Sequence, residues 1–272
     1  MQQFPVLPKE IFRSLWRNRG LINALIQREV VGRYRGSFMG ILWSFFNPVF
    51  MLAVYTFVFS VVFKARWSGG GDSKTEFALV LFAGMIVFSL FSECVNRAPN
   101  LILSNANYVK KVVFPLEILP IVNIGAALFH LLISLIVWLI FYIIFFGIPQ
   151  LTLLLFPVVL LPLILFTLGI SWILASLGVY LRDVGQIVGV ITTALMFLSP
   201  IFYPVTALPK EYQILLHLNP LTLVIEQTRQ TLVWGTVPNI GLWALYLIGS
   251  ALVAWLGFAW FQKTRKGFAD VI

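Results

Sequence analysis

The chain has 272 residues, of which 60% are apolar and only 11% charged, with a mean hydropathy of +0.95. A soluble globular protein carries about 25% charged residues, so this composition indicates an integral membrane protein with no room for a large soluble domain. The net charge of +9 is not read as nucleic-acid binding, because the cations gather at the ends of apolar runs. The single cysteine, Cys94, excludes an internal disulfide and a cysteine-based metal cluster.

Residues 1–37 are expected to form a cytoplasmic amphipathic segment. A basic helix is predicted from Lys9 to Arg17, and an interruption follows at Asn18. The next helix has one apolar face, formed by Leu21, Ile22, Leu25, Ile26 and Val30. This pattern favours a helix that lies on the inner leaflet over an ordinary soluble helix. No cleavable signal peptide is expected, because the first long apolar run begins after this polar lead.

The junction between this segment and the first span sets the predicted sidedness. Residues 38–63 are 26 consecutive uncharged residues, enough to cross a bilayer as a tilted helix. More Lys and Arg residues precede this run than lie in the loop that follows it, and cytoplasmic loops carry an excess of these residues, so the N-terminus is predicted to lie inside the cell. Gly32, Gly36 and Gly40 lie at the junction. They favour a hinge over a close helix–helix contact.

Six membrane-spanning helices are predicted in residues 38–272, with both termini inside the cell. They are 39–63, 77–95, 112–146, 151–181, 184–203 and 237–261. With this topology, fourteen of the 19 Lys and Arg residues fall on the inner side. Asn47-Pro48 predicts a kink in the first span. The apolar run near 212–225 is too short to cross and is broken by Asn219-Pro220, so a re-entrant outer segment is predicted.

The sequence lacks the usual catalytic patterns. No P-loop and no H-E-x-x-H motif occur. An ion-coupled carrier needs several ionisable groups inside the membrane, and the predicted spans offer only Glu93, Glu117 and His130. His130 is interpreted as a neutral residue that hydrogen-bonds between helices. Glu93 and Glu117 are expected at the inner interface, near Arg97, Lys110 or Lys111.

Aromatic side chains are abundant, with 25 Phe, 9 Trp and 8 Tyr. Most are expected at the lipid or the membrane interfaces. The alternative is a conduit whose aromatic faces let sugars slide. Its candidates are Trp43, Phe46, Phe50, Phe57, Phe88, Phe91, Phe197 and Tyr203.

Several segments together resemble one known family, the type-2 ABC exporter permeases for lipid-linked polysaccharide such as O-antigen, capsule and teichoic acid. The resemblance covers nearly the whole chain and rests on the order and spacing of short motifs. They are residues 28–37 (REVVGRYRGS), 40–44 (GILWS), Asn47-Pro48, 105–115 (NANYVKKVVFP), Glu117, Pro120, 199–204 (SPIFYP) and Asn219-Pro220.

The resemblance implies a function and a set of partners. It implies a homodimeric permease in the cell inner membrane, with two copies of a separate ABC ATPase and no cofactor of its own. Residues 101–112 would form the coupling helix that contacts the ATPase, through Asn105, Asn107, Tyr108, Lys110 and Lys111. The N-terminal helix would be a cytoplasmic gate, 212–225 an outer gate, and spans one, two and five the walls of the conduit.

Two questions stay open at this stage. Arg28, Arg33 and Arg35 are expected either to attract the diphosphate of a lipid-linked substrate or to act only as positive-inside charge. An ABC permease for drugs or small lipids would share the topology. A membrane enzyme is disfavoured because no loop gathers carboxylates or histidines.

Overall fold

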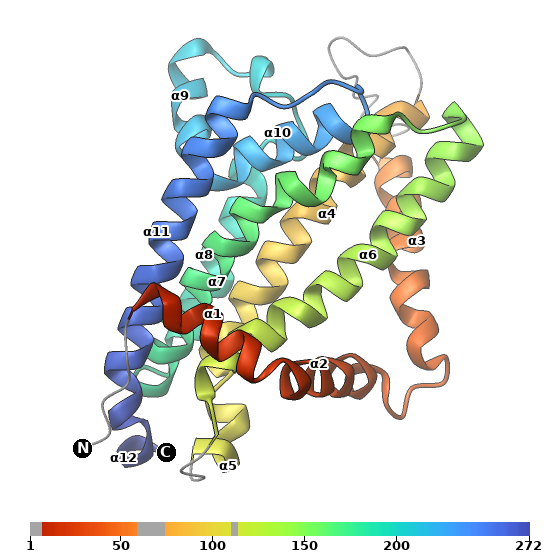
Figure 1. The fold of residues 1–272 in the computed structure, drawn as a ribbon. Helices are drawn as coiled ribbons and strands as arrows, with labels where there is room; N and C mark the ends of the chain where they lie inside the picture. The colour runs from red at the N-terminus through yellow and green to blue at the C-terminus, as the bar shows by residue number, and fades with distance from the viewer. Residues whose placement is uncertain (1–6, 59–73, 110–113) are drawn as a thin grey trace.

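The computed structural model describes residues 7–58, 74–109 and 114–272, and all regular structure within them is helical. Five described helices are long and apolar enough to cross a membrane, within 40–58, 75–100, 116–146, 151–180 and 240–271. Their α-helical parts are α3 (Trp43–Tyr55), α4 (Lys74–Arg97), α6 (Leu119–Phe146), α7 (Phe156–Tyr180) and α11 (Ile240–Thr264). A sixth apolar helix, α8 (Val184–Leu198), is shorter but runs beside them (Figure 1).

The observed helices follow the predicted spans, with differences at their ends. The fifth predicted span reaches residue 203, but α8 ends at Leu198 and Ser199 is extended, with ψ 150°. The residue before a proline is pushed out of the helical region, and Pro200 follows Ser199. The third predicted span begins with a separate turn, η5 (Leu116–Ile118), ahead of α6. Residues 59–63 and 112–113 of the predicted spans lie outside the described residues.

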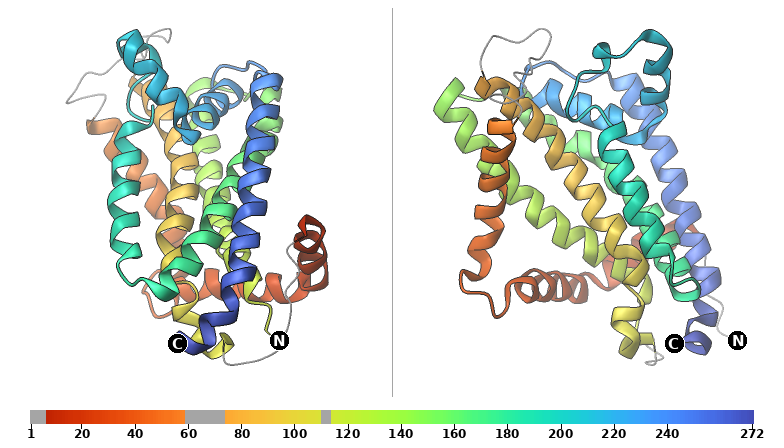
Figure 2. Two further views of the ribbon diagram at one scale, coloured as in Figure 1. Left: turned by 90° about the vertical axis from the view of Figure 1, so that its left-hand side faces the viewer. Right: turned by 180° about the vertical axis from the view of Figure 1, so that it is seen from behind.

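The core of the bundle is centred on α4. This helix packs against α3, α6, α7, α8 and α10 (Pro220–Leu232), and the views in Figures 1 and 2 show it inside the bundle. Along α4, residues such as Val80, Ala83 and Val87 have no exposed surface. By contrast α3, which is described in full, buries only Leu52. α3 therefore presents most of its apolar surface outward.

Two helices at the N-terminus lie across the spanning helices (Figure 1). They are α1 (Pro8–Arg17) and α2 (Arg19–Tyr34), and Asn18 separates them where the sequence predicts an interruption. The predicted apolar face of α2 packs on the start of α6, because Ile22 and Leu25 form a cluster with Ile118 and Val122. We call the end of the bundle that carries α2 and α12 (Phe268–Val271) the terminal end, and the opposite end the distal end.

The turn from α2 into α3 passes through two glycines with positive φ, 84° at Gly36 and 54° at Gly40. Such conformations cost a non-glycine residue free energy. A Cβ atom at Gly32, Gly36 or Gly40 would meet no atom within 4 Å. Within one chain none of the three is a helix-packing surface, and Gly36 and Gly40 form the turn while Gly32 lies inside α2.

Short helices lie at both ends of the helix bundle. η3 (Ala98–Asn100), η4 (Leu103–Asn105) and α5 (Ala106–Val109) follow α4 at the terminal end, where η8 (Arg265–Gly267) follows α11. At the distal end η6 (Leu151–Leu155) precedes α7, and η7 (Val205–Ala207) and α9 (Lys210–Leu218) precede α10. The predicted break lies between α9 and α10, where Asn219 Oδ1 accepts a hydrogen bond from the Leu221 amide at 3.0 Å. This bond caps α10.

Candidate functional site

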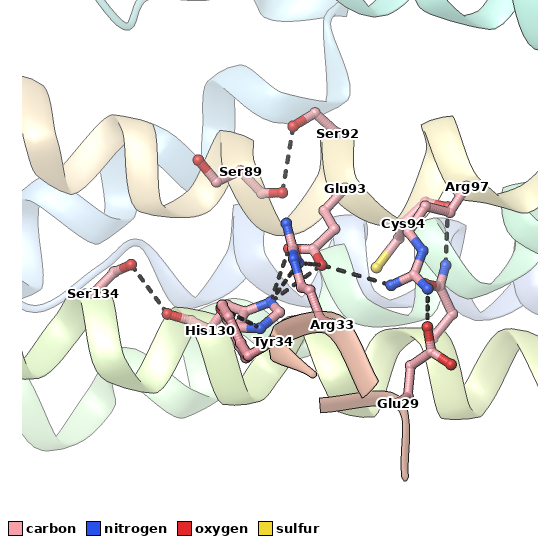
Figure 3. A network of polar contacts seen from close by, with 11 residues as sticks. Glu29, Arg33, Tyr34, Ser89, Ser92, Glu93, Cys94, Arg97, His130 and Ser134 are labelled. Carbon is pink, nitrogen blue, oxygen red and sulfur yellow. Dashed lines mark hydrogen bonds and ion pairs between the residues drawn. The ribbon is translucent and has the colours of Figure 1, made fainter. Parts of the chain in front are cut away.

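A cluster of charged side chains joins α2 to α4 at the terminal end (Figure 3). Arg33 of α2 pairs with Glu93 of α4, and Glu29 of α2 pairs with Arg97 of α4. Glu93 also lies 3.9 Å from Arg97, so the expected proximity of these two residues is confirmed. Residues 29 and 33 are one turn apart on α2, and residues 93 and 97 are one turn apart on α4. The two ion pairs therefore lie side by side where α2 contacts α4.

His130 of α6 completes this cluster. Its Nδ1 atom lies 3.1 Å from Glu93 Oε1, and its Nε2 atom lies 3.2 Å from the Tyr34 hydroxyl. Burial raises the pKa of Tyr34, which keeps the phenol protonated. The Arg33 guanidinium also lies 2.9 Å from Nδ1, so the imidazole of α6 contacts polar groups of both α2 and α4. This supports the interpretation of His130 as a residue that hydrogen-bonds between helices.

A cavity of about 160 Å³ lies beside this cluster, between α3, α4 and α6. Its wall includes the charged groups of Arg33 and Glu93, and the ring of His130. Its other polar lining residues are Tyr34, Ser44, Asn47, Tyr55, Ser89 and Ser134. The sequence does not reveal this cavity, because its lining comes from four helices, α2, α3, α4 and α6, whose packing only the structure shows.

A second polar centre lies around Glu117, in η5. Its carboxylate accepts hydrogen bonds from Ser14 of α1 at 2.9 Å and from Arg265 at 2.6 Å. Its backbone carbonyl accepts from the indole of Trp172 in α7 at 3.0 Å. Both chain ends and α7 therefore meet at one buried residue. The sequence analysis places Glu117 near the inner interface, but does not identify Arg265 as a partner.

A third centre, at Arg229 of α10, is missed by the sequence analysis. Its side chain is fully buried and donates to the carbonyl oxygens of Val80, Pro200 and Ile201 at 3.2, 2.6 and 2.8 Å. It also pairs with Glu226 at 2.9 Å. Burial lowers the pKa of Arg229 to about 10, against the opposing effect of Glu226, so the group is charged at neutral pH. A Glu and an Arg three residues apart, next to the apolar stretch 223–225, are the available sequence signal.

The expected gate cations have different surroundings. Arg33 belongs to the cluster of Figure 3. Arg28 donates a hydrogen bond to the hydroxyl of Tyr108. Arg35 is exposed and makes no ion pair with a described residue. Of these three cations, only Arg33 forms an ion pair with a described residue, and Arg35 has no side-chain partner among the described residues.

The expected coupling segment is partly described. Tyr108 stacks on Phe114, with ring centroids 4.1 Å apart, and contacts Arg28 of α2. Asn105 donates to the Leu101 carbonyl at 2.9 Å, and Asn107 is exposed. Lys110 and Lys111 lie outside the described residues. The segment therefore contacts α2 through Tyr108, a link the sequence analysis does not anticipate.

The expected conduit aromatics fall into two groups. Phe88 and Phe91 are buried in the core of the single chain, where Phe91 stacks on Phe166 at 6.4 Å. The other six lie on the surface or are partly covered: Trp43, Phe46, Phe50, Phe57, Phe197 and Tyr203. The exposed members of this set thus lie in the α3 and α8 regions.

Comparison with known proteins gives consistent matches over most of the chain. The family model described as ABC-2 type transporter matches residues 20–233. An O-antigen export system permease protein from Myxococcus xanthus is 31% identical, over 96% of this chain and 99% of that protein. One from Klebsiella pneumoniae is 26% identical, over 93% and 95%. A polysialic acid transport protein from Escherichia coli is 27% identical, over 90% and 93%.

Proposed function

The chain belongs to the ABC-2 type transporter family, and from this premise we propose that it is the permease subunit of an exporter of lipid-linked polysaccharide, most specifically O-antigen. The observation that carries the proposal is the end-to-end similarity to O-antigen export permeases of matching length. The relatives are named for O-antigen export and polysialic acid transport, which favours a polysaccharide substrate over a drug or a small lipid. ATP hydrolysis belongs to a separate ATPase subunit.

The proposed topology has six spans, with the terminal end in the cytoplasm and the distal end outside the inner membrane. The positive-inside rule supports it, because fourteen of the 19 basic residues fall on the inner side. In this proposal α8 is the fifth span. Its 15 residues measure about 22 Å, so the non-helical residues 199–203 would complete the crossing. α9 and α10 form the re-entrant outer segment.

The coupling proposal assigns residues 101–112 to the ATPase contact. The link from Tyr108 to Arg28 supports it, because a movement of this segment would reach α2 directly. The first experiment is affinity purification of the tagged chain from native membranes, with Lys110→Glu/Lys111→Glu as the test variant and Lys210→Glu as control. An ABC ATPase that co-purifies with wild type and control, and is lost from the test variant, supports the proposal. Absence of an ATPase from every sample contradicts it.

The conduit proposal places the sliding path between two copies of the chain. Support comes from the outward apolar surface of α3 and the exposed aromatics Phe46, Phe50 and Phe197. Phe88 and Phe91 stay candidates only if the helices around α4 rearrange during transport. Replacing Phe46 and Phe50 with Ser should reduce export of long chains more than ATPase activity. Replacing Phe145 and Phe146, exposed on α6, supplies the control.

The gate proposal assigns Arg28, Arg33 and Arg35 to the attraction of the substrate diphosphate. Arg35 gives the sharpest test because it makes no ion pair with a described residue, so Arg35→Gln breaks no ion pair in the described parts of the chain. We expect export to fall at least several-fold, with an increase in the substrate concentration needed for half-maximal ATPase stimulation. Normal export in the Arg35→Gln variant and in the triple Gln variant would leave only the positive-inside role.

A further inference from the structure

Helix α1 is fixed to the bundle by one of its faces. Ser14 is 4% exposed and donates a hydrogen bond to the Glu117 carboxylate at 2.9 Å. Ile11 packs against the main core, and Leu15 packs against the cluster that joins α2 to α6. Residues 11, 14 and 15 are three and four positions apart, so they lie on one side of the helix. The opposite side of α1 is therefore turned away from the bundle.

This outward face combines two aromatic side chains with cations. Phe12 is 75% exposed, and Trp16, one turn later, is 74% exposed. Lys9, Arg13 and Arg17 are exposed beside them. A helix face that presents aromatic area and positive charge together suits the boundary between acyl chains and phosphates, where one part of the face is apolar and the other is charged.

The charge on and next to α1 is strongly positive. Residues 9–19 contain four cations and one carboxylate, which gives a net charge of +3. The carboxylate, on Glu10, pairs with Arg13 at 2.8 Å. The guanidinium of Arg19 lies over the Trp16 ring, 4.9 Å from its centroid. An indole and a cation are thus held together, and a guanidinium binds phosphate oxygens well because it offers several donors in one plane.

The position of α1 favours lipid over a soluble partner. α1 lies across the outside of the spanning helices, whereas α5 and α12 extend beyond it at the terminal end (Figure 1). A protein that docks from the cytoplasm would meet α5 and α12 first. The neighbouring helix α2 does not offer the same surface, because Ile22 and Leu25 of its apolar face pack on the start of α6. Of the two N-terminal helices, α1 is therefore the one placed to contact headgroups.

We propose that the outward face of α1 binds anionic glycerophospholipids of the leaflet nearest α2. Phe12 and Trp16 would enter the boundary between headgroups and acyl chains, and Arg13 and Arg17 would donate hydrogen bonds to phosphates. The proposal rests on the topology under Proposed function, which places this end at the cytoplasmic leaflet, where anionic lipids give a negative surface potential. Bound headgroups would also hold α1 against Glu117.

The test measures amide hydrogen exchange in residues 8–17 of the full chain in nanodiscs. One set contains phosphatidylcholine alone, and the other also contains phosphatidylglycerol with the same acyl chains. The readout is the ratio of the two exchange rates, so a change that a substitution makes to α1 itself cancels. Arg13→Gln/Arg17→Gln is the charge variant. Lys263→Gln/Lys266→Gln is the matched control, because it removes the same charge from exposed positions at the same end of the bundle.

The attraction of one cation to an anionic surface is worth about a factor of five, so exchange in residues 8–17 should be slower by about that factor or more with phosphatidylglycerol. The ratio should fall close to one in the charge variant, and the control should keep the wild-type ratio. Phe12→Ser/Trp16→Ser should also lower the ratio. Salt at about 1 M should do the same in the wild type, because the Debye length is then only about 3 Å.

Equal exchange of the wild type in the two lipid compositions would overturn the proposal, as would a control that loses the ratio as fully as the charge variant. Slow exchange in lipid-free detergent that depends on protein concentration would also overturn it, and would assign the outward face of α1 to a second copy of the chain. None of these measurements needs an ATPase or export. Failure here therefore leaves the proposed function untouched, and absence of an ATPase on purification would leave this test valid.

Discussion

Gly257 of α11 packs directly on the backbone of Gly169 of α7. A Cβ atom at Gly257 would lie 2.2 Å from the Gly169 carbonyl oxygen, and one at Gly169 would lie 2.5 Å from the Val253 carbonyl oxygen. Both distances are far below van der Waals contact, and the atoms they meet belong to the backbone. Small residues at such a crossing let two membrane helices approach closely, which gains dispersion contacts along both helices.

We therefore predict that Gly257→Ala destabilises the chain, because α7 and α11 must separate to admit the methyl group. Overpacking of this kind costs about 1–3 kcal/mol. Thermal unfolding in detergent should show a lowered melting temperature. Gly249→Ala is the control on the same helix, because a Cβ there meets nothing within 4 Å. Equal melting temperatures for the two variants would contradict the close crossing.

A second prediction concerns Arg229. Arg229→Met removes the donor shared by three carbonyl groups at the distal end, and each buried acceptor left without a partner costs about 1–3 kcal/mol. We expect a loss of about 3 kcal/mol in unfolding free energy and faster proteolysis of residues 201–219. Arg229→Lys should recover only part of the loss, because one ammonium group lacks the fork of donors that guanidinium has.

Lys210→Met, at an exposed position on α9, tests whether loss of any distal cation has the same effect. If it destabilises the chain as much as Arg229→Met does, the carbonyl contacts are not the reason for the loss.

The sequence predicts the helices of this fold much better than the contacts between them. Hydropathy locates each apolar run, and Asn219-Pro220 marks the break between α9 and α10. The Glu117–Arg265 pair joins residues 148 positions apart, so only the tertiary arrangement reveals it. The burial of Arg229 likewise depends on carbonyl groups from three segments that meet in space.

The aromatic residues show a related limit. Phe46 and Phe88 both belong to helices that are apolar on every side, and periodicity does not distinguish a core-facing from an outward-facing position in such helices. The structure separates them because α4 is surrounded by five helices and α3 is not. Of the candidate site, the sequence predicts the position of the cations at the terminal end, but not their partners Tyr108 and Glu93.

A third prediction uses the Glu29–Arg97 pair between α2 and α4. Reversal of either charge alone, Glu29→Arg or Arg97→Glu, places like charges together and should loosen α2 from the bundle. The double reversal restores an opposite pair. We expect amide hydrogen exchange in residues 19–34 to be about tenfold faster in each single variant and intermediate in the double variant, because the carboxylate introduced at position 97 then lies beside Glu93. Exchange in the double variant as fast as in the single variants would show that the pair does not hold α2.

The last prediction concerns the turn between α2 and α3. Gly36 has a φ of 84°, and an L-residue in a left-handed conformation costs about 1–2 kcal/mol. Gly36→Val should therefore destabilise the turn more than Gly36→Asn, because Asn tolerates positive φ better. Gly32→Ala is the matched control inside α2, where alanine is favoured over glycine by about 1 kcal/mol. We expect the melting temperature to be highest for Gly32→Ala, lower for Gly36→Asn and lowest for Gly36→Val. Equal melting temperatures for the two Gly36 variants would contradict the left-handed turn.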